Sequence, residues 1–395
     1  MMLQSLHTSR CPRLGLLILA IALGPPLKAA EHDNPPAATL VAGRVLQPDG
    51  TLRADTAIHV RNGRIEALGP AAEARGEAVR RFGANTVICP GLIDLFSSIG
   101  AVGQTAETVS AFDPGANAAD ALDPRDPHFP AGLRAGITAA LVAPSPDNLV
   151  GGACVCFRTF VDRGRLDVLR ADGPLAFSLG EGVWRGDRLP TSRAGAVYQL
   201  RKLLTKAERG EAHPRVDAAL AGQLDAVLIC KTRHDVASAR QVFADRFGRF
   251  AVALGEDAVE CADDLGGRQQ PVVVGPYSFT SERRVLLGAA ELAGKGIEVA
   301  FRGGFPQTPP DGLRLTAALA VRHGLDPAAA RRALTVAPAR VAGVADRIGM
   351  LTPGKEADLV VFSQDPLRLD AAVLEVYVKG VRVYAADRRA PGGKP

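Results

Sequence analysis

Histidine is the side chain that most often binds a catalytic metal, and this sequence contains seven. They are His7, His32, His59, His128, His213, His234 and His323. Two histidines spaced by one residue on a strand could bind one zinc ion from the same side, but no two of these have that spacing. Only His234 closely follows an apolar run, which ends at Cys230. One histidine and one cysteine do not complete a metal site, so the sequence predicts none.

Other polar side chains follow the apolar runs and could line a pocket. Arginine suits bidentate recognition of a carboxylate, so Arg233 and Arg302 are candidate anchors for an anion. Alternatively, they are rim residues paired with acids such as Asp235. We assign no catalytic residue, although a metal-free nucleophile, Ser98 or Cys230 beside Lys231 or His234, is a further alternative. The candidate pocket residues are Ser98, Lys231, Arg233, His234 and Arg302.

The elements that would position these residues are short apolar runs separated by helical stretches. Such runs are typical of strands buried on both faces of a parallel sheet. The runs are 137–144, 224–230, 249–254, 270–276 and 297–301. The helical stretches are 196–208, 235–247, 281–295 and 313–324. This alternation predicts a closed β/α barrel of about 250 residues, whose strands end at one open mouth. His128 precedes the second barrel strand, so we expect it at the opposite end of the barrel.

Both ends of the chain have β-strand patterns. Two alternating segments flank Asn62-Gly63, and the C-terminal pair flanks Lys379-Gly380; the first dipeptide is a strong hairpin signal. We expect the two ends to pair into one small sandwich.

Three segments resemble the amidohydrolase superfamily, specifically its imidazolonepropionase-like branch. They read VICPGLIDLFSSIG (87–100), AGITAALVAPSPDNLVGG (135–152) and ALTVAPARVAGVADRIGMLTPGKEADLVVFSQDPL (333–367). The resemblance implies an α/β fold, with a (β/α)8 TIM-like barrel over 89–345. It also implies a small composite β-sandwich formed by both termini, 31–88 and 346–395. Active relatives hold zinc at the barrel mouth and hydrolyse C–N bonds other than peptide bonds.

The resemblance also identifies the positions that hold the metal in active relatives, and here they carry other residues. Phe96 and Ser98 replace the histidine pair after PGLID, while Cys230 and Leu254 stand at later histidines. Gly303, or its neighbour Gly304, replaces the catalytic aspartate. A phenyl ring donates no lone pair and a neutral hydroxyl is a weak zinc ligand. The resemblance therefore implies a lost metal site and no cofactor in this chain.

The leading interpretation is an exported, non-catalytic homologue that binds a small ligand or a partner. The partner would be an active relative or a second copy of the chain. An active hydrolase of amide bonds with an unconventional site is the alternative. A third interpretation is a structural subunit whose barrel mouth is filled by Phe96.

The N-terminal residues 1–30 resemble a signal peptide. Arg10 and Arg13 precede an apolar run, 14–23, which is about half the length needed to span a bilayer. Cleavage is expected after Ala29 or Ala30, and an uncleaved anchor is the alternative. We therefore expect an exported, periplasmic protein with no membrane span after signal removal.

Charge and cysteine content exclude two other classes. The formal charge is +5, but basic and acidic residues alternate along most of the chain, so no nucleic-acid partner is expected. Beyond Cys11 five cysteines remain, an odd and dispersed set that predicts no disulfide framework.

Overall fold

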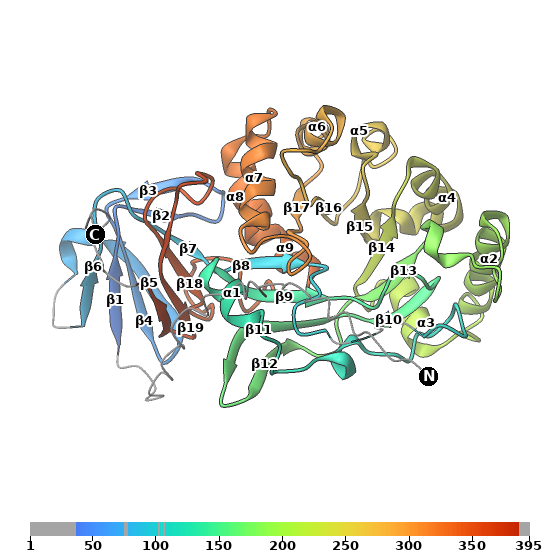
Figure 1. The fold of residues 1–395 in the computed structure, drawn as a ribbon, viewed down its shortest axis with the longest axis horizontal. Coiled ribbons are helices and arrows are strands. Elements are labelled where there is room, and N and C mark those ends of the chain that lie inside the picture. The colour runs from blue at the N-terminus through green and yellow to red at the C-terminus, as the bar shows by residue number, and fades with distance from the viewer. Residues whose placement is uncertain (1–36, 75–77, 102, 104, 106, 387–395) are drawn as a thin grey trace, which may run out of the picture.

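A computed structural model describes residues 37–74, 78–101, 103, 105 and 107–386. A β-sandwich lies on the left of Figure 1, and a barrel of parallel strands with outer helices lies on the right. The predicted α/β class, a TIM-like barrel with a small β-sandwich from both ends of the chain, is confirmed. Among the described residues, no helix has the length and apolar character needed to cross a bilayer. The predicted signal segment lies outside the described residues.

The sandwich consists of two sheets that enclose a common core. The first sheet has the order β5-β4-β1-β6, with β1 Ala38–Val41, β4 Thr56–Arg61, β5 Arg64–Pro70 and β6 Val79–Arg81. The second has the order β20-β19-β18-β7-β2-β3, with β2 Arg44–Leu46, β3 Leu52–Ala54, β7 Val87–Pro90, β18 Leu359–Phe362, β19 Val373–Val378 and β20 Val381–Ala385. Strand β18 from the C-terminal end pairs directly with β7 from the N-terminal end.

Both predicted hairpins are confirmed. Strands β4 and β5 pair antiparallel around Asn62-Gly63, and β19 and β20 pair around Lys379-Gly380. Asn62 and Lys379 have φ values of 51° and 48°, and the following glycines have 76° and 73°. Two consecutive residues in the left-handed region are what a two-residue hairpin turn requires, and glycine adopts that region without a Cβ clash.

The barrel strands form two hydrogen-bonded sheets. In one, β8 Leu92–Leu95 and β9 Ile137–Val142 are parallel. In the other, parallel strands run in sequence order: β13 Leu175–Ser178, β14 Ala226–Cys230, β15 Ala251–Leu254, β16 Val272–Val274 and β17 Val299–Phe301. All five apolar runs coincide with strands of this set.

Between β9 and β13 the wall of the barrel contains antiparallel strands that the sequence did not predict as a group. They are β10 Val150–Ala153, β11 Val155–Asp162 and β12 Arg165–Arg170. Strand β11 pairs with β9 and with β12, whereas β10 pairs with β13. In Figure 1 the β11–β12 hairpin projects below the barrel.

Helices cover the outside of the barrel (Figure 1). They are α1 Phe129–Arg134, α2 Arg193–Ala207, α3 Pro214–Ala221, α4 Arg233–Phe243, α5 Ala258–Cys261, α6 Arg283–Gly294, α7 Gly312–Arg322, α8 Pro327–Leu334 and α9 Val336–Val341. Short 3-10 helices occur at Ala71–Glu73, Ala118–Ala121, Glu181–Val183 and Ala244–Arg249. The four predicted helical stretches coincide with α2, α4, α6 and α7 within a few residues.

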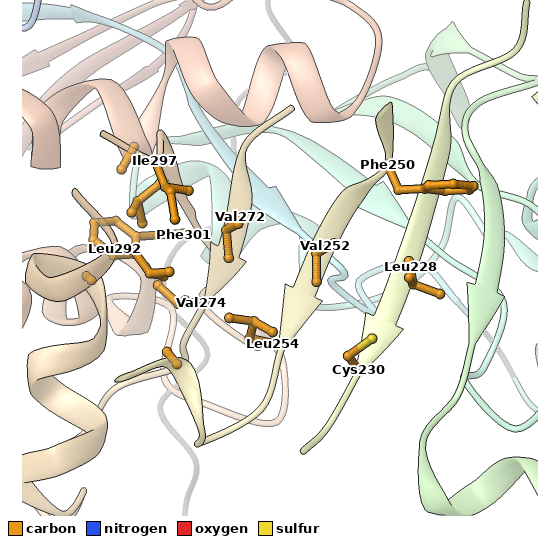
Figure 2. Close-up of a cluster of buried hydrophobic side chains, with 14 of the residues drawn as sticks. Leu228, Cys230, Phe250, Val252, Leu254, Val272, Val274, Leu292, Ile297 and Phe301 are labelled. Atoms are coloured by element: carbon orange, nitrogen blue, oxygen red, sulfur yellow. The ribbon is translucent and has the colours of Figure 1, made fainter. Parts of the chain in front are cut away.

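Along most barrel strands, alternate residues belong to two different apolar clusters. The inner cluster contains the side chains that face the barrel interior, and the outer cluster contains those that pack against the helices. The inner strand residues are Ile93, Leu95, Ala139, Leu141, Ala176, Val227, Ala251, Ala253, Val273 and Ala300. The outer strand residues include Leu228, Cys230, Val252, Leu254, Val272, Val274 and Phe301, drawn in Figure 2 with Leu292 of α6. This alternation decides which residues can reach the mouth.

A buried charged cluster joins the sandwich to the barrel. The Arg158 side chain on β11 is fully buried. Its Nε lies 2.8 Å from Asp358 Oδ2, Nη1 lies 2.8 Å from Asp167 Oδ2, and Nη2 bonds to Glu356. Arg347 Nε donates to Glu356 Oε1 at 2.7 Å. Buried charges that are each paired and hydrogen-bonded fix the return of the chain from barrel to sandwich.

Candidate binding site at the barrel mouth

On β14 and β15, the residue that faces the barrel mouth is one position later in the sequence than expected. Cys230 and Leu254 are opposite each other in the β14–β15 register, and both side chains pack in the outer cluster against the helices. Their side chains therefore do not face the barrel interior. Because Ile229 and Ala253 contact the inner cluster, the next inward positions are Lys231 and Gly255. Neither an ammonium group nor a glycine is a usual zinc ligand.

Phe96 is the first residue after β8, and its ring packs against the inner cluster at the mouth. Its φ of 52° is a left-handed conformation that a non-glycine residue adopts rarely. The turn places a partly buried phenyl ring where the resemblance expected the first histidine. The ring therefore extends the apolar filling of the barrel toward its open end.

Ser98, at the second histidine position, is bonded to the loop after β17. Its Oγ lies 2.8 Å from Gln307 Oε1 and 2.6 Å from Gln307 Nε2, and its N–H donates to Phe305 O at 3.2 Å. The neighbouring Ser97 Oγ also donates to Phe305 O, at 2.7 Å. Since β8 and β17 share no described ladder, these bonds connect the two strands across the seam of the barrel.

Gly303, at the position expected for the catalytic aspartate, has no room for a side chain. A Cβ there would lie 2.8 Å from both Cβ and N of Leu313, at the start of α7. At Gly304, whose φ is 76°, a Cβ would lie 3.2 Å from Pro276 Cγ and from Thr308 Cγ2. Real Cβ contacts are almost never as short as the first of these. A carboxylate at position 303 would require the loop or α7 to move.

Asp94 at the seam is a buried carboxylate that sequence reasoning missed. It is fully buried, its Oδ1 accepts from the Gly303 N–H at 2.6 Å, and its Oδ2 has no hydrogen-bond partner among the described residues. Burial raises the pKa of Asp94 to about 6, against the opposing effects of backbone N–H groups and the positive charge of Arg302. A charged residue inside the apolar segment GLIDL was the signal that could have identified it.

Arg302 follows β17 and reaches a cavity of about 440 Å³ at the ends of β15, β16 and β17. Its Nε donates to Gly275 O at 2.6 Å, and burial lowers the pKa of its guanidinium. The loop 275–282 forms most of the lining, with Gly255 and Glu256 from the end of β15. Of the predicted pocket residues, Arg302 is the one that lines this cavity.

The other predicted pocket residues lie at strand ends but do not line this cavity. Lys231, Arg233 and His234 are exposed, and Ser98 is bonded to Gln307. The Arg233 side chain makes no ion pair with the described residues, although its N–H donates to Asp257 Oδ2 at 3.0 Å. Asp235 pairs instead with Arg193, at 2.5 Å. The structure therefore does not bring these five residues into one constellation.

His128 lies at the mouth end of the barrel, and the expectation that placed it at the opposite end is wrong. It precedes α1, which runs antiparallel to the strands, and its ring centroid is 5.8 Å from that of Phe305, which follows β17. Its Nδ1 lies 2.6 Å from Asp126 Oδ1. The ring packs outside the barrel, because Phe305 belongs to an apolar cluster between α1, β9 and β11.

The residues at the mouth do not fit a catalytic zinc ion. Zinc needs three or four imidazole, thiolate or carboxylate ligands on one centre. Within the described ranges, no group of three or more His, Cys, Asp or Glu side chains could hold a metal ion. All five described cysteines are buried and unpaired, and burial raises the pKa of the Cys230 thiol.

Comparison with known proteins places this architecture in a family. A family model described as the amidohydrolase family matches residues 220–384. An amidohydrolase from Thermotoga maritima MSB8 superimposes with a TM-score of 0.75 at 25% identity, covering 88% of this chain and 100% of that chain. Residues 220–384 match the amidohydrolase family, and the chain as a whole has the fold of an amidohydrolase. The sandwich and the barrel therefore occur together in the solved amidohydrolase structure as they do here.

Two other amidohydrolase relatives extend the comparison. Amidohydrolase tasK from Hapsidospora irregularis is 24% identical over an alignment of length 378 that covers 80% of this chain. The match spans 38% of the length of that curated relative. A prolidase complexed with N-methylphosphonate-L-proline is 17% identical, covers 89% of this chain and 100% of its own, and has a TM-score of 0.55. At that identity it shares the amidohydrolase fold alone.

Proposed function

We propose that this chain is a non-catalytic, metal-free member of the amidohydrolase superfamily, of the imidazolonepropionase-like branch, that binds a small ligand or a protein partner at its barrel mouth. The observation that carries the proposal is the packing at Gly303. A Cβ there would lie 2.8 Å from Leu313, so the position expected for the catalytic aspartate cannot carry a carboxylate in this backbone. Without that carboxylate, a metal-bound water would lack its proton acceptor.

The inward positions of the neighbouring strands support the same proposal. By the alternation along the strands, Lys231, Gly255 and Arg302 follow the inward residues Ile229, Ala253 and Ala300, and the Phe96 ring packs on the same inner cluster. Two of these residues are cations, which oppose the binding of a second cation nearby. The mouth is therefore suited to an anion rather than to zinc.

The Phe96 ring also favours a second candidate, a structural subunit with a filled mouth. The cavity beside Arg302 favours the ligand-binding form, because a volume of 440 Å³ falls in the range of small-molecule sites. An active hydrolase of amide bonds with an unconventional site is the third candidate, and its activity would survive a chelator.

Metal content and turnover test the proposal on the same preparation. Purified protein is dialysed against zinc, washed in metal-free buffer, and assayed with N-acylated amino acids and dipeptides with and without chelator. We expect far less than one zinc per chain and no turnover. Stoichiometric zinc with chelator-sensitive turnover would overturn the proposal, and chelator-resistant turnover would support the third candidate.

Export to the periplasm is part of the proposal and rests on residues 1–30. Arg10 and Arg13 before the apolar run 14–23 are typical of a secretory signal. Expression of the full chain in a Gram-negative host, followed by fractionation and N-terminal sequencing, tests it. A mature N-terminus at Ala30 or Glu31 in the periplasmic fraction is expected, and an intact N-terminus in the cytoplasm would contradict export.

A further inference from the structure

We propose that the cavity at the carboxyl ends of β15, β16 and β17 binds the carboxylate of a small monoanionic molecule, with the guanidinium of Arg302 as its anchor. The inference rests on the proposed function, because it names the ligand chemistry of the metal-free mouth. Three features of the cavity support it: the free edge of one guanidinium, a group of hydroxyls, and the distribution of acids at the rim.

The guanidinium of Arg302 is held at one edge and free at the other. Its Nε donates to the carbonyl oxygen of Gly275 at 2.6 Å, which fixes the plane of the group. Nη1 and Nη2 make no hydrogen bond with any described residue, yet neither is a buried, unsatisfied atom. Two parallel N–H donors of a fixed guanidinium match the two oxygens of a carboxylate. The free edge is therefore preorganised for a bidentate oxyanion.

The hydroxyls of Ser278, Thr280 and Ser281 line the same cavity. Ser278 Oγ lies 2.9 Å from Thr280 Oγ1 and 3.2 Å from Ser281 Oγ. Ser281 Oγ also accepts from the Ser278 N–H at 3.0 Å, so its own proton can bond either to Ser278 Oγ or to a ligand. Hydroxyl rotors can donate to an anion or accept from it, so this loop supplies neutral polar contacts beside the cation.

Acids at the rim restrict the charge of the ligand. Glu256 and Glu282 line the cavity, and their side chains are 74% and 71% exposed. Arg284 lies 3.7 Å from Glu256 and 2.9 Å from Glu282, but it also pairs with Asp257 and Glu260, so it offsets only part of their charge, and water screens the rest. Glu256 and Glu282 lie at the rim, so the guanidinium of Arg302 at the inner end can still bind one negative group. A second negative group on the ligand would lie near these acids and be repelled. A monocarboxylate should therefore bind better than a dicarboxylate or phosphate.

Ligand titrations with butyrate, succinate and inorganic phosphate test the inference. Saturation-transfer NMR is recorded in 150 mM chloride on dialysed, metal-free protein, and thermal unfolding confirms that each variant is folded. We expect butyrate to bind better than succinate or phosphate, and Arg302→Met to weaken butyrate by about tenfold or more, the usual effect of losing a charge-assisted pair. Arg302→Lys should weaken it less, because it keeps the charge but loses the fork.

The matched control is Arg322→Gln, which removes the same charge from an exposed arginine at the far end of α7. It should bind butyrate as the natural chain does. If Arg302→Met fails to fold, Arg302→Lys and Ser281→Ala carry the test, since both leave side chains of similar size. Butyrate binding unchanged in the folded variants overturns the inference, as does tighter binding of phosphate.

The two proposals fail in distinguishable ways. If butyrate binding does not depend on Arg302 and the protein shows no zinc and no turnover, the carboxylate site is wrong but the non-catalytic assignment stands. If turnover depends on zinc and butyrate binding depends on Arg302, the non-catalytic assignment is wrong but the carboxylate site stands.

Discussion

Asp94 Oδ1 accepts a hydrogen bond of 2.6 Å from the backbone N–H of Gly303, across the seam between β8 and β17. The carboxylate thus contacts the backbone of the residue expected to carry the catalytic aspartate. Ser97 and Ser98 reinforce the same seam through Phe305. Side chains at the carboxyl end of β8, where metal ligands would be expected, connect the barrel wall instead.

The packing at Gly303 predicts that a restored carboxylate destabilises the fold. Gly303→Asp and Gly303→Ala both place a Cβ 2.8 Å from Leu313, so each should cost about 1–3 kcal/mol or more of unfolding free energy, as overpacking does. Urea unfolding measures it. Gly294→Ala, exposed near the end of α6 with no atom within 4 Å of the added Cβ, is the control and should be stabilising by about 0.4–1 kcal/mol. Equal stability of Gly303→Ala and the natural chain would show that the loop has room.

Restoring the first two histidines should not restore a metal centre. The double variant Phe96→His, Ser98→His supplies two imidazoles, but Lys231 and Gly255 occupy the next inward positions and Gly303 cannot carry the base. We expect no stoichiometric zinc after dialysis and no hydrolysis of N-acylated amino acids. Tight zinc binding by this variant alone would mean that further ligands lie closer than the register indicates.

The charged cluster around Arg158 predicts that the free energy of unfolding falls in acid. Although burial opposes it, the arginines Arg347 and Arg158 hold the pKa of Glu356 down to about 2, below its ordinary 4.5. A depressed carboxylate pKa gives stability that is present above pH 4.5 and is lost as the pH falls toward 2. The loss should reach about 3 kcal/mol on the scale of 1.36 kcal/mol per unit. Unfolding free energies of the natural chain and Glu356→Gln, compared between pH 5 and 2, should converge; a constant difference would contradict the assignment.

Asp94 predicts how the proposed carboxylate site responds to pH. Its pKa is raised to about 6, so it becomes negative above that value and opposes an anion on the nearby Arg302. Butyrate affinity should fall a few-fold as the pH rises from 5.5 to 7.5, a range in which butyrate itself stays ionised. In Asp94→Asn this dependence should disappear. If butyrate affinity falls equally with pH in the variant, a group other than Asp94 causes the pH dependence.

The sequence predicted the barrel strands well because each is buried on both faces. Runs such as 224–230 and 249–254 are continuously apolar, so they identify a strand regardless of its orientation. A continuous apolar run has no alternation of polar and apolar residues, so it does not reveal which side chains face inward. The sequence therefore could not show that Cys230 faces the helices and Lys231 the mouth. The error of one residue at the strand ends follows from this physical ambiguity.

Other features depended on contacts between distant segments. The β10–β12 insertion needs β9 and β13 as partners, and its glycines gave no clear strand signal. His128 was misplaced because α1 returns it to the mouth end, beside Phe305, which follows the last barrel strand. The cavity at Arg302 depends on the loop 275–282, whose residues have no regular pattern. Arg302 itself could be predicted, since it directly follows an apolar run.

Zinc content after dialysis shows whether the barrel mouth holds a metal ion. The natural chain is equilibrated with excess zinc, exhaustively dialysed against metal-free buffer, and analysed by mass spectrometry for metal per folded chain. Because no set of zinc-binding side chains meets at the inward positions of the described barrel strands, we predict far less than one zinc per chain. One tightly held zinc per chain would mean that the chain is a metal-binding protein after all.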